Sequence, residues 1–300
     1  YIRRYNLVCD YYQGVTHRGG WKSVIQNLID EKIVVYKDIL TNNISLVDCC
    51  EAFFVWEKLF EKYQLGSWIG MIHFCYNLPD FLHFENVDLL LDNEDFRSHL
   101  PSCQGIIVLS PYLKKYIQKK FPNLKIYVLK HPVENINTKF SMEKFILNPH
   151  KNLIQLGYQS RMISSIFRIR TPWKKVLLTG RKNTPREILS RVKQEINYLK
   201  ITNLNITLNN INIQYFEKNE DYDNFLTQNI CIIPLWDASA NNSILEIISM
   251  NIPSFVTKME STVFYLGDNY PMFYEDLEEI NNIIQHTDQF YTLILKTYHY

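Results

Sequence analysis

A short polar segment between two apolar runs carries side chains suited to binding a phosphate. Its polar residues, which follow the apolar run 230–235, are Ser239, Asn241, Asn242 and Ser243. The residues that come next have the apolar spacing of a helix, so we expect a helix to begin within this segment. The first turn of a helix offers unpaired backbone N–H groups and the positive end of its dipole, which attract an anion. The pattern therefore predicts an anion site, although an ordinary N-capped helix gives the same pattern.

A carboxylate lies one turn into the expected helix. Glu246 could accept hydrogen bonds from the hydroxyl pair of a ribose, because an ionised carboxylate is an acceptor on both oxygens. The helix is followed by Pro253 and a second apolar run, so the segment reads as strand, loop, helix and strand. A site for a phosphate beside a carboxylate for a ribose predicts a nucleotide site in the second half of the chain.

The composition bounds the class of protein. The chain has 300 residues, of which 46% are hydrophobic, and this length suits two domains of about 150 residues each. A net charge of +1 argues against a nucleic-acid binder that depends on neutralising phosphates. The 6 cysteines form no CxxC pair, which predicts free thiols in a reducing compartment such as the cytoplasm. No apolar run reaches the ~18 residues of a membrane-spanning helix, and the chain starts at Tyr1 rather than Met, as a piece of a longer protein would.

Apolar runs alternate with amphipathic segments in both halves of the chain. The first half predicts strands over 6–9, 33–36, 44–47, 68–72, 105–109 and 126–129, and helices over 21–29, 51–63 and 112–121. The second half predicts strands over 152–156, 175–178, 211–215 and 230–235, helices over 185–199 and 222–228, and a helical region over 278–300. This alternation predicts an α/β fold with two Rossmann-like parallel-sheet domains. We place the domains at 1–135 and 152–285, with 136–151 as a linker.

Several ordered pieces of the chain resemble GT-B glycosyltransferases of the large group that contains family 4, and above all its small members from bacteria and viruses. In chain order the pieces are Arg18-Gly19-Gly20-Trp21, Ile72-His73-Phe74, the helix entry 108–113, Leu156-Gly157 with Arg161, the polar segment through Glu246, and Tyr265-Leu266-Gly267 with Tyr270-Pro271. No piece is specific by itself, and the resemblance rests on their order over most of the chain. It implies two domains that face a cleft, with the acceptor bound by 1–135, the nucleotide sugar bound by 152–285, and a C-terminal helix at 286–300 that packs back on the N-terminal domain.

The resemblance implies a hexosyltransferase that moves a sugar from UDP- or GDP-hexose to a hydroxyl of a glycan, protein or other acceptor. The negative charge of a diphosphate grows as the glycosidic bond breaks, so such a site needs fixed cations or N–H dipoles. Arg161 matches the family's arginine after the first strand of the second domain. Arg168 is the best match for the second cation, with Arg181 and Lys182 in reserve.

Three residues of the first half match the donor side of the family's site. Gly19 and Gly20 would let the backbone approach the diphosphate or the donor sugar, because neither carries a Cβ. His73, at the end of a strand, would hydrogen-bond the donor sugar or its leaving group, although a lone histidine at such a place is often structural.

The chain departs from the family at one carboxylate. Glu246 matches the second of the family's paired glutamates, whereas the position of the first holds Ala238 and the neighbouring residue is Asp237. Either Asp237 takes the role of holding a sugar hydroxyl or that contact is absent. The choice between a retaining and an inverting reaction therefore stays open, and Asp237 and His73 are the candidate catalytic residues.

Two other functions fit the same fold. The missing glutamate favours a catalytically silent module that binds a sugar nucleotide or glycan, whereas Arg161, Asn242 and Glu246 argue against it. A nucleic-acid-base glucosyltransferase is disfavoured by the near-neutral charge. The resemblance implies no metal and no other cofactor, and we expect the acidic run 217–223 to be a solvated loop and helix cap rather than a cation site. The donor base and membrane association of the first domain stay open.

Overall fold

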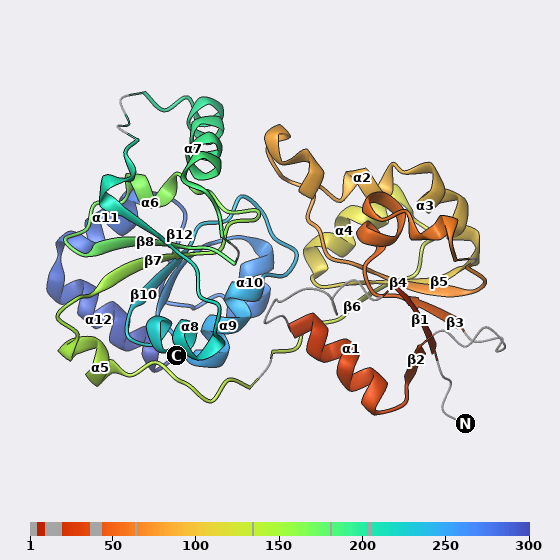
Figure 1. Ribbon diagram of the computed structural model, residues 1–300, viewed down its shortest axis with the longest axis horizontal. Coiled ribbons are helices and arrows are strands. Elements are labelled where there is room, and N and C mark those ends of the chain that lie inside the picture. Colours follow the sequence, from red (N-terminus) through yellow and green to blue (C-terminus); the bar gives the residue numbers. More distant parts are fainter. Residues whose placement is uncertain are drawn as a thin grey trace. The chain divides into compact units, whose positions relative to one another are not determined.

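The computed structural model describes residues 5–9, 20–36, 44–63, 65–133, 135–180, 182–202, 204 and 206–300. The chain divides by its contacts into two units, and each unit is built on a parallel sheet flanked by helices (Figure 1). The first unit comprises Tyr1–Val133 and Asp237–Ala240, and the second comprises Glu134–Trp236 and Asn241–Tyr300. The short segment Asp237–Ala240 therefore groups with the first unit, although it follows a strand of the second in the chain.

The sheet of the first unit has the strand order β2-β1-β3-β4-β5-β6, and its described pairs are all parallel. The strands are β1 (Tyr5–Cys9), β2 (Val34–Tyr36), β3 (Ile44–Val47), β4 (Trp68–Ile72), β5 (Cys103–Val108) and β6 (Ile126–Val128). The helices are α1 (Gly20–Asp30), α2 (Asp88–Leu91), α3 (Glu94–His99) and α4 (Pro111–Lys120). The direction of winding reverses between β1 and β3, and in open α/β sheets ligands bind at the carboxyl ends of the strands at such a switch point.

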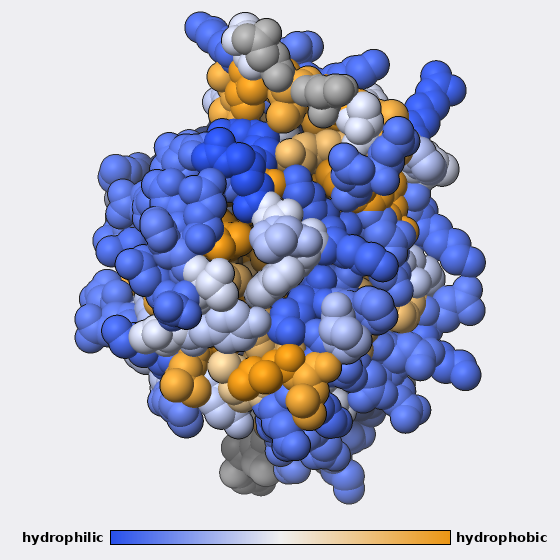
Figure 2. Space-filling model, turned by 90° about the vertical axis from the view of Figure 1, so that its left-hand side faces the viewer, coloured by the Kyte–Doolittle hydropathy of each residue, from blue (hydrophilic) through white to orange (hydrophobic). Residues whose placement is uncertain are grey.

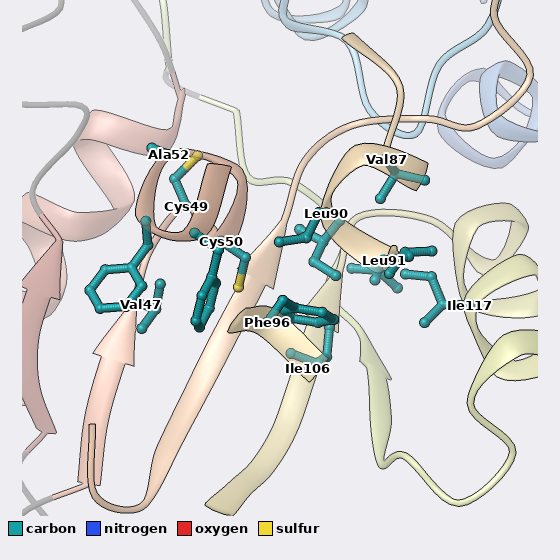
Figure 3. Close-up of a cluster of buried hydrophobic side chains, with 14 of the residues drawn as sticks. Val47, Cys49, Cys50, Ala52, Val87, Leu90, Leu91, Phe96, Ile106 and Ile117 are labelled. Atoms are coloured by element: carbon teal, nitrogen blue, oxygen red, sulfur yellow. The ribbon is translucent and has the colours of Figure 1, made fainter. Parts of the chain in front are cut away.

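Large apolar side chains fill the space between this sheet and the helices α2, α3 and α4 (Figure 3). Phe54 lies at the centre of the cluster, with its ring centroid 5.4 Å from that of Phe96 and 5.6 Å from that of Trp68. All three side chains are fully buried. Each side chain of this size contributes about 1.5–3 kcal/mol when it leaves water, so this cluster fixes the helices on the sheet.

The helix predicted over 51–63 is wrong. The structure instead has a π-helical turn over Ala52–Trp56 and a 3-10 turn over Leu59–Glu61. Between them Lys58 adopts a left-handed conformation with φ 46°, which interrupts the hydrogen-bond ladder of a helix. The apolar spacing of this stretch reflects the burial of Phe53 and Phe54 in the core rather than one continuous helix.

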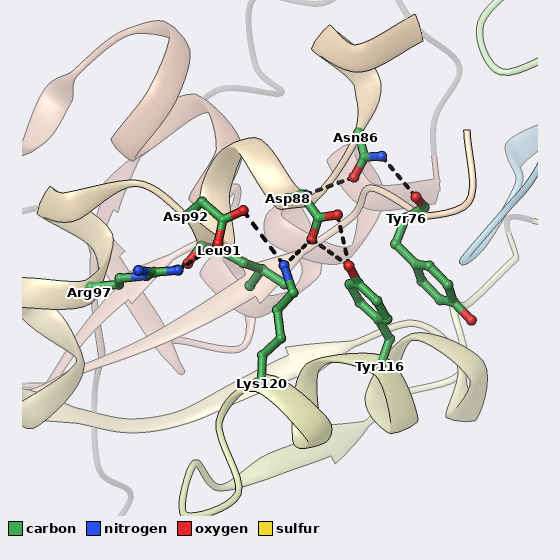
Figure 4. Close-up of polar contacts among 8 residues, drawn as sticks. All are labelled: Tyr76, Asn86, Asp88, Leu91, Asp92, Arg97, Tyr116 and Lys120. Atoms are coloured by element: carbon green, nitrogen blue, oxygen red, sulfur yellow. Dashed lines mark hydrogen bonds and ion pairs between the residues drawn. The ribbon is translucent and has the colours of Figure 1, made fainter. Parts of the chain in front are cut away.

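Polar contacts also tie α2 to α4 (Figure 4). The Tyr116 hydroxyl donates to both oxygens of Asp88, at 2.7 and 2.8 Å, and Lys120 Nζ donates to Asp88 at 2.6 Å. The Tyr116 ring also stacks on Tyr76, which follows β4, with centroids 3.8 Å apart. The outer face of α4 is therefore partly paired with α2 and is not solvated along its whole length.

The sheet of the second unit has the order β12-β11-β10-β7-β8-β9, again with parallel described pairs. The strands are β7 (Asn152–Leu156), β8 (Lys174–Leu178), β9 (Ile211–Gln214), β10 (Ile230–Ile233), β11 (Ser254–Thr257) and β12 (Phe273–Tyr274). The helices are α5 (Met142–Leu147), α6 (Ser165–Arg168), α7 (Pro185–Leu199), α8 (Asn219–Leu226), α9 (Asn242–Met250), α10 (Glu260–Leu266), α11 (Leu277–Gln285) and α12 (Thr287–Tyr298). Counted within the unit, this is the doubly wound order 3-2-1-4-5-6, whose switch point lies between β7 and β10.

The C-terminal helix α12 has its described ring contacts inside the second unit. Phe290 packs against Trp173 and Phe255, with ring centroids 5.2 and 5.8 Å away. Beyond the helix, the Tyr300 hydroxyl donates to the carbonyl of Leu266 at 2.9 Å. These contacts anchor the end of the chain to the second sheet, and the expected packing of 286–300 on the N-terminal domain stays a prediction.

The surface is mostly hydrophilic on the face that Figure 2 shows, with apolar side chains gathered in small patches. Among the described helices, none combines the length and apolar character needed to cross a bilayer. The free cysteines among the described residues are Cys49, Cys50, Cys75, Cys103 and Cys231, in agreement with the thiols expected from the sequence.

Candidate functional site

The loops that follow β7 and β10 meet at the switch point of the second unit. Met162 N donates to the carbonyl of Pro234 at 2.9 Å, and Trp236 N donates to the carbonyl of Ser160 at 3.1 Å. Gly157 follows β7 and Pro234 follows β10, and the loops that begin there occupy the carboxyl edge of the sheet. The meeting of the loops brings Arg161 next to the start of α9.

Arg161 is a buried cation that joins the two loops. Its Nη2 donates to Asn241 Oδ1 at 2.8 Å and to Ser243 Oγ at 2.9 Å. Its Nε donates to the carbonyl of Leu156 at 3.2 Å, and its Nη1 donates to that of Gln159 at 2.6 Å. These acceptors are neutral oxygens, so the contacts orient the guanidinium without cancelling its charge.

Asn241 caps α9 and occupies a position with three donors. Its Oδ1 accepts from Arg161 Nη2, from Ser243 N at 3.0 Å and from Ile244 N at 3.4 Å. The sequence predicted unpaired N–H groups here, whereas the Asn241 side chain takes two of them. An anionic oxygen at the place of Oδ1 would meet a guanidinium, two backbone amides and the positive end of α9. We call this place the three-donor position.

The loop that carries Arg161 is anchored by α7. Glu195, which is fully buried, accepts from Ile163 N at 2.9 Å and from Ser164 N at 2.6 Å. The Arg191 Nε donates to Glu195 at 2.9 Å, so the carboxylate is neutralised one turn away on the same helix. A buried carboxylate that accepts two amides and a guanidinium bond fixes the backbone that follows Arg161.

Two residues of β7 and its end complete this support. Gln155 is buried in the strand, donates to the carbonyl of Met162 at 3.2 Å and accepts from Ile166 N at 3.0 Å. Gly157 has φ +81°, and a Cβ there would come within 3.0–3.2 Å of the Arg161 guanidinium. Glycine is therefore required at this position both by the backbone conformation and by the close approach of Arg161.

The other predicted residues of the second unit lie around this centre. Glu246, partly buried on α9, accepts from the Tyr222 hydroxyl at 2.7 Å. Asn242 is exposed at the first position of α9. Arg168 ends α6, and its Nη1 lies 3.8 Å from Met162 Sδ. Burial raises the pKa of Tyr274, and the charge of Arg168 opposes this shift. No described hydrogen bond joins Arg168 to Arg161.

His73 follows β4 in the first unit and is held at three points. Its backbone N and that of Phe74 donate to Glu51 Oε1 at 2.7 and 2.8 Å. Its Nε2 lies 2.7 Å from the carbonyl of Asp48, so this nitrogen carries the proton and Nδ1 is the acceptor of the neutral ring. Burial lowers the pKa of His73, and the nearby Glu51 charge opposes this shift.

His131, which follows β6, is a buried histidine at this edge of the sheet. Burial lowers its pKa to about 4 against an ordinary value of 6.5, and the proximity of His73 adds to the shift. The Nδ1 atom donates to the carbonyl of Pro132 at 2.8 Å. Both rings are therefore neutral in the folded protein at neutral pH.

The low pKa of His131 predicts acid sensitivity of the first unit. Between about pH 4 and 6.5 the unfolded chain binds more protons than the folded one. The free energy of unfolding therefore decreases as the pH is lowered through this window, by up to about 1.4 kcal/mol per pH unit. In His131→Asn, whose amide can keep the bond to Pro132, this part of the loss is absent. Urea midpoints at pH 7 and pH 5 measure it. His83→Asn, at an exposed histidine bonded to a carbonyl, should match the parent, and an equal loss in His131→Asn would contradict the assignment.

Asp237 and Ser239 lie in the short segment Asp237–Ala240, which groups with the first unit. Asp237 accepts from Asn77 N at 2.9 Å, and burial raises the pKa of its carboxyl, while hydrogen bonds from the Asn77 and Ala238 amides oppose the shift. Ser239 Oγ lies 3.2 Å from Ser110 Oγ, the cap of α4. The contacts of these two side chains are thus structural ones, and a contact of Asp237 with a sugar stays a prediction.

The structure therefore brings together Arg161, Asn241 and Ser243, and it links Glu246 to Tyr222. Gly20 starts α1, and Gly19 lies outside the described residues. Sequence reasoning missed Glu51, Glu195 and Tyr222. A carboxylate on the apolar face of α7, four residues after Arg191, was the one local signal that could have indicated Glu195. Within the described part of the chain, no group of three or more His, Cys, Asp or Glu is placed to hold a metal ion.

Comparison by sequence finds no matching family model and no matching curated protein. Comparison by structure finds HepE from Anabaena, solved with UDP-glucose, with a TM-score of 0.60 at 10% identity over 100% of this chain and 94% of that one. Sucrose-phosphate synthase from Thermosynechococcus elongatus has a TM-score of 0.57 at 12% identity over 85% of this chain and 67% of that one. TarM has a TM-score of 0.57 at 14% identity, and the chain spans 50% of its length.

These similarities show the fold. Both units contribute, because HepE is matched along the whole chain and each unit has the parallel sheet expected from the sequence. The expectation of two Rossmann-like domains is thereby confirmed, and the chain has the GT-B fold.

Proposed function

We propose that the protein is a glycosyltransferase that moves a hexose from a nucleoside diphosphate sugar to an acceptor hydroxyl. The three-donor position carries this proposal, because Arg161 Nη2, Ser243 N and Ile244 N converge on Asn241 Oδ1 at the switch point of the second sheet, and a phosphate oxygen would take the place of that oxygen. A phosphate oxygen is the ligand group that such a set of donors suits. The second unit holds the donor nucleotide, and the first binds the acceptor.

The proposed chemistry depends on charge at the leaving group. As the bond between the sugar and the diphosphate breaks, negative charge grows on the phosphate oxygen that leaves with the nucleotide. The Arg161 guanidinium and the first turn of α9 are held in place by their contacts, so they stabilise this charge once the Asn241 side chain gives up its place to the phosphate oxygen. Protein groups therefore manage the diphosphate, with Arg168 as a second cation, and no metal ion is required in this scheme.

The remaining predicted residues have roles around the sugar. In this scheme His73, whose Nε2 is held by the carbonyl of Asp48, hydrogen-bonds the donor sugar or its leaving group. Asp237 holds a sugar hydroxyl, while Gly19 and Gly20 allow the backbone to approach the donor. Ser239, in the loop before α9, and Asn242, at the start of α9, contribute polar contacts.

Uridine is the first donor base to test. HepE was solved with UDP-glucose and with UDP and glucose, and a TarM variant from S. aureus was solved with UDP and alpha-GlcNAc-glycerol. GDP-hexoses are the alternative donors, and a glycan or protein hydroxyl is the proposed acceptor. The free cysteines fit a reducing compartment, so we propose that the reaction takes place in the cytoplasm.

A binding screen followed by a turnover assay tests the function. The purified chain is heated with UDP, GDP, their common hexose conjugates and NAD as the unrelated nucleotide, and stabilisation by one nucleotide family is expected. Release of free nucleotide and transfer or hydrolysis of the sugar are then followed by mass spectrometry. Binding without turnover would show that the protein is a catalytically silent module that binds a sugar nucleotide. No stabilisation by any nucleotide would reject the site.

Arg161→Lys is expected to weaken nucleotide diphosphate binding about tenfold, because an ammonium cannot reproduce the planar guanidinium, whose Nη2 meets Asn241 and Ser243 while Nε and Nη1 donate to the carbonyls of Leu156 and Gln159. Titration calorimetry with UDP or GDP measures the Kd. Arg170→Lys is the matched control, since Arg170 is exposed in the same stretch and pairs with Glu278 at the surface. An unchanged Kd in Arg161→Lys would show that the guanidinium is only structural.

A further inference from the structure

The carboxylate of Glu246 is held by a residue that no sequence motif indicated. Tyr222, on α8, donates from its hydroxyl to Glu246 Oε2 at 2.7 Å. The two helices α8 and α9 lie side by side in the second unit (Figure 1), and the hydrogen bond crosses between them. Both side chains are only partly buried.

The position of the Tyr222 hydroxyl is fixed by aromatic neighbours. The Tyr222 ring meets Phe216 edge to face, with centroids 6.3 Å apart, and Phe216 packs on Phe225 at 5.3 Å. Phe216 follows β9, whose carboxyl end borders the same edge of the sheet as the ends of β7 and β10. A rigid ring with a single polar atom at its tip is suited to orient a flexible carboxylate.

The orientation of Glu246 matters because a glutamate side chain loses much rotamer freedom when it binds. Fixing it before the ligand arrives removes that entropic cost from the binding step. An ionised carboxylate only accepts hydrogen bonds, and a ribose offers two neighbouring hydroxyl donors. A carboxylate whose direction is already set can meet that pair, whereas a mobile one gains less from each hydroxyl.

We propose that Tyr222 is a positioning residue that sets Glu246 for the two ribose hydroxyls, so that the site selects ribonucleotides over deoxyribonucleotides. This inference rests on the proposed function, since it assigns the specificity of the same nucleotide site. Tyr222 does not contact the reacting atoms, and its effect passes through Glu246. A site built to bond a hydroxyl rejects the analogue that lacks it, because its polar group is left unpaired.

The test compares Tyr222→Phe with the parent protein on three ligands. The probes are UDP, 2′-deoxy-UDP and 3′-deoxy-UDP, or the GDP series if the screen selects guanosine, and calorimetry gives each Kd. The parent is expected to bind the ribonucleotide about tenfold or more tighter than at least one deoxy analogue. In Tyr222→Phe, which keeps the ring and removes the hydroxyl, the ribonucleotide should bind about 5–10-fold more weakly and the deoxy analogues nearly unchanged, so that the ratio collapses.

Two variants isolate the effect. Tyr215→Phe removes a hydroxyl from a neighbouring tyrosine and should keep the ratio. In a Glu246→Gln background, Tyr222→Phe should have little additional effect, because the two changes act on one contact. Equal weakening of all three ligands in Tyr222→Phe, or an unchanged ratio, would overturn this inference and leave the proposed function standing. A parent protein that binds no nucleotide would overturn both.

Discussion

Asn241→Asp is expected to weaken nucleotide diphosphate binding by about 100-fold or more while the second unit stays fully folded. The substituted oxygen lies at the three-donor position, within reach of Arg161 Nη2, Ser243 N and Ile244 N. There an anionic carboxylate takes the place that a phosphate oxygen would need. Bringing the phosphate against it places like charges together, which costs several kcal/mol.

The same substitution should not harm folding. Aspartate caps helices as well as asparagine does, and its charge interacts favourably with the positive end of α9. It would also form a charge-assisted bond to Arg161. Opposite effects on binding and stability separate a ligand role from a structural role, since a damaged cap would lower both.

Calorimetry with UDP or GDP and urea unfolding of the same samples measure the two effects. Asn224→Asp adds the same charge at an exposed position of α8 and should bind like the parent. If Asn241→Asp binds the nucleotide with the parent's affinity, the three-donor position is not the diphosphate site. If it unfolds at a much lower urea concentration, the cap does not tolerate the charge.

Glu195→Ala is expected to lower the free energy of unfolding of the second unit by about 3–5 kcal/mol. The change leaves the Arg191 guanidinium buried without its carboxylate, and it removes the acceptor of Ile163 N and Ser164 N. Each of these groups is buried, so water cannot replace the lost hydrogen bonds and their loss lowers the free energy of unfolding.

Urea unfolding measures the loss, and two other variants calibrate it. Glu195→Gln keeps an oxygen acceptor but not the charge, so we expect an intermediate loss. Glu187→Ala removes an exposed carboxylate from the first turn of α7 and should cost at most about 1 kcal/mol. A loss in Glu195→Ala no larger than in Glu187→Ala would show that the buried pair does not hold the loop.

The parts of the fold with strong local signals were predictable from the sequence. The α7 helix spans Pro185–Leu199 as predicted, because Thr184 and Glu187 form a capping box and proline stands at its first position. The start of α9 at Asn242 follows from the preference of asparagine for the cap. The alternation of strands and helices predicted two Rossmann-like domains, and the resemblance of the ordered motifs predicted the GT-B fold.

The contacts that shape the candidate site were not predictable, because they join residues far apart in the chain. Glu195 lies more than 30 residues along the chain from the two amides that donate to it, and Tyr222 lies 24 residues from Glu246. Lys58 shows the same limit at the level of the backbone, since packing of the core overrides the helical spacing around it. The predicted roles of Arg161, His73 and Asp237 in binding and transfer stay predictions.

The support of the Arg161 loop has a consequence for how this protein can evolve. Glu195 and Gln155 contact the loop through main-chain atoms of Met162, Ile163, Ser164 and Ile166. Main-chain N–H and C=O groups are the same for every amino acid except proline, so substitutions between 162 and 166 that fit the buried surroundings leave unchanged what the anchor recognises. Changes of this kind alter the sequence of the loop and preserve its shape.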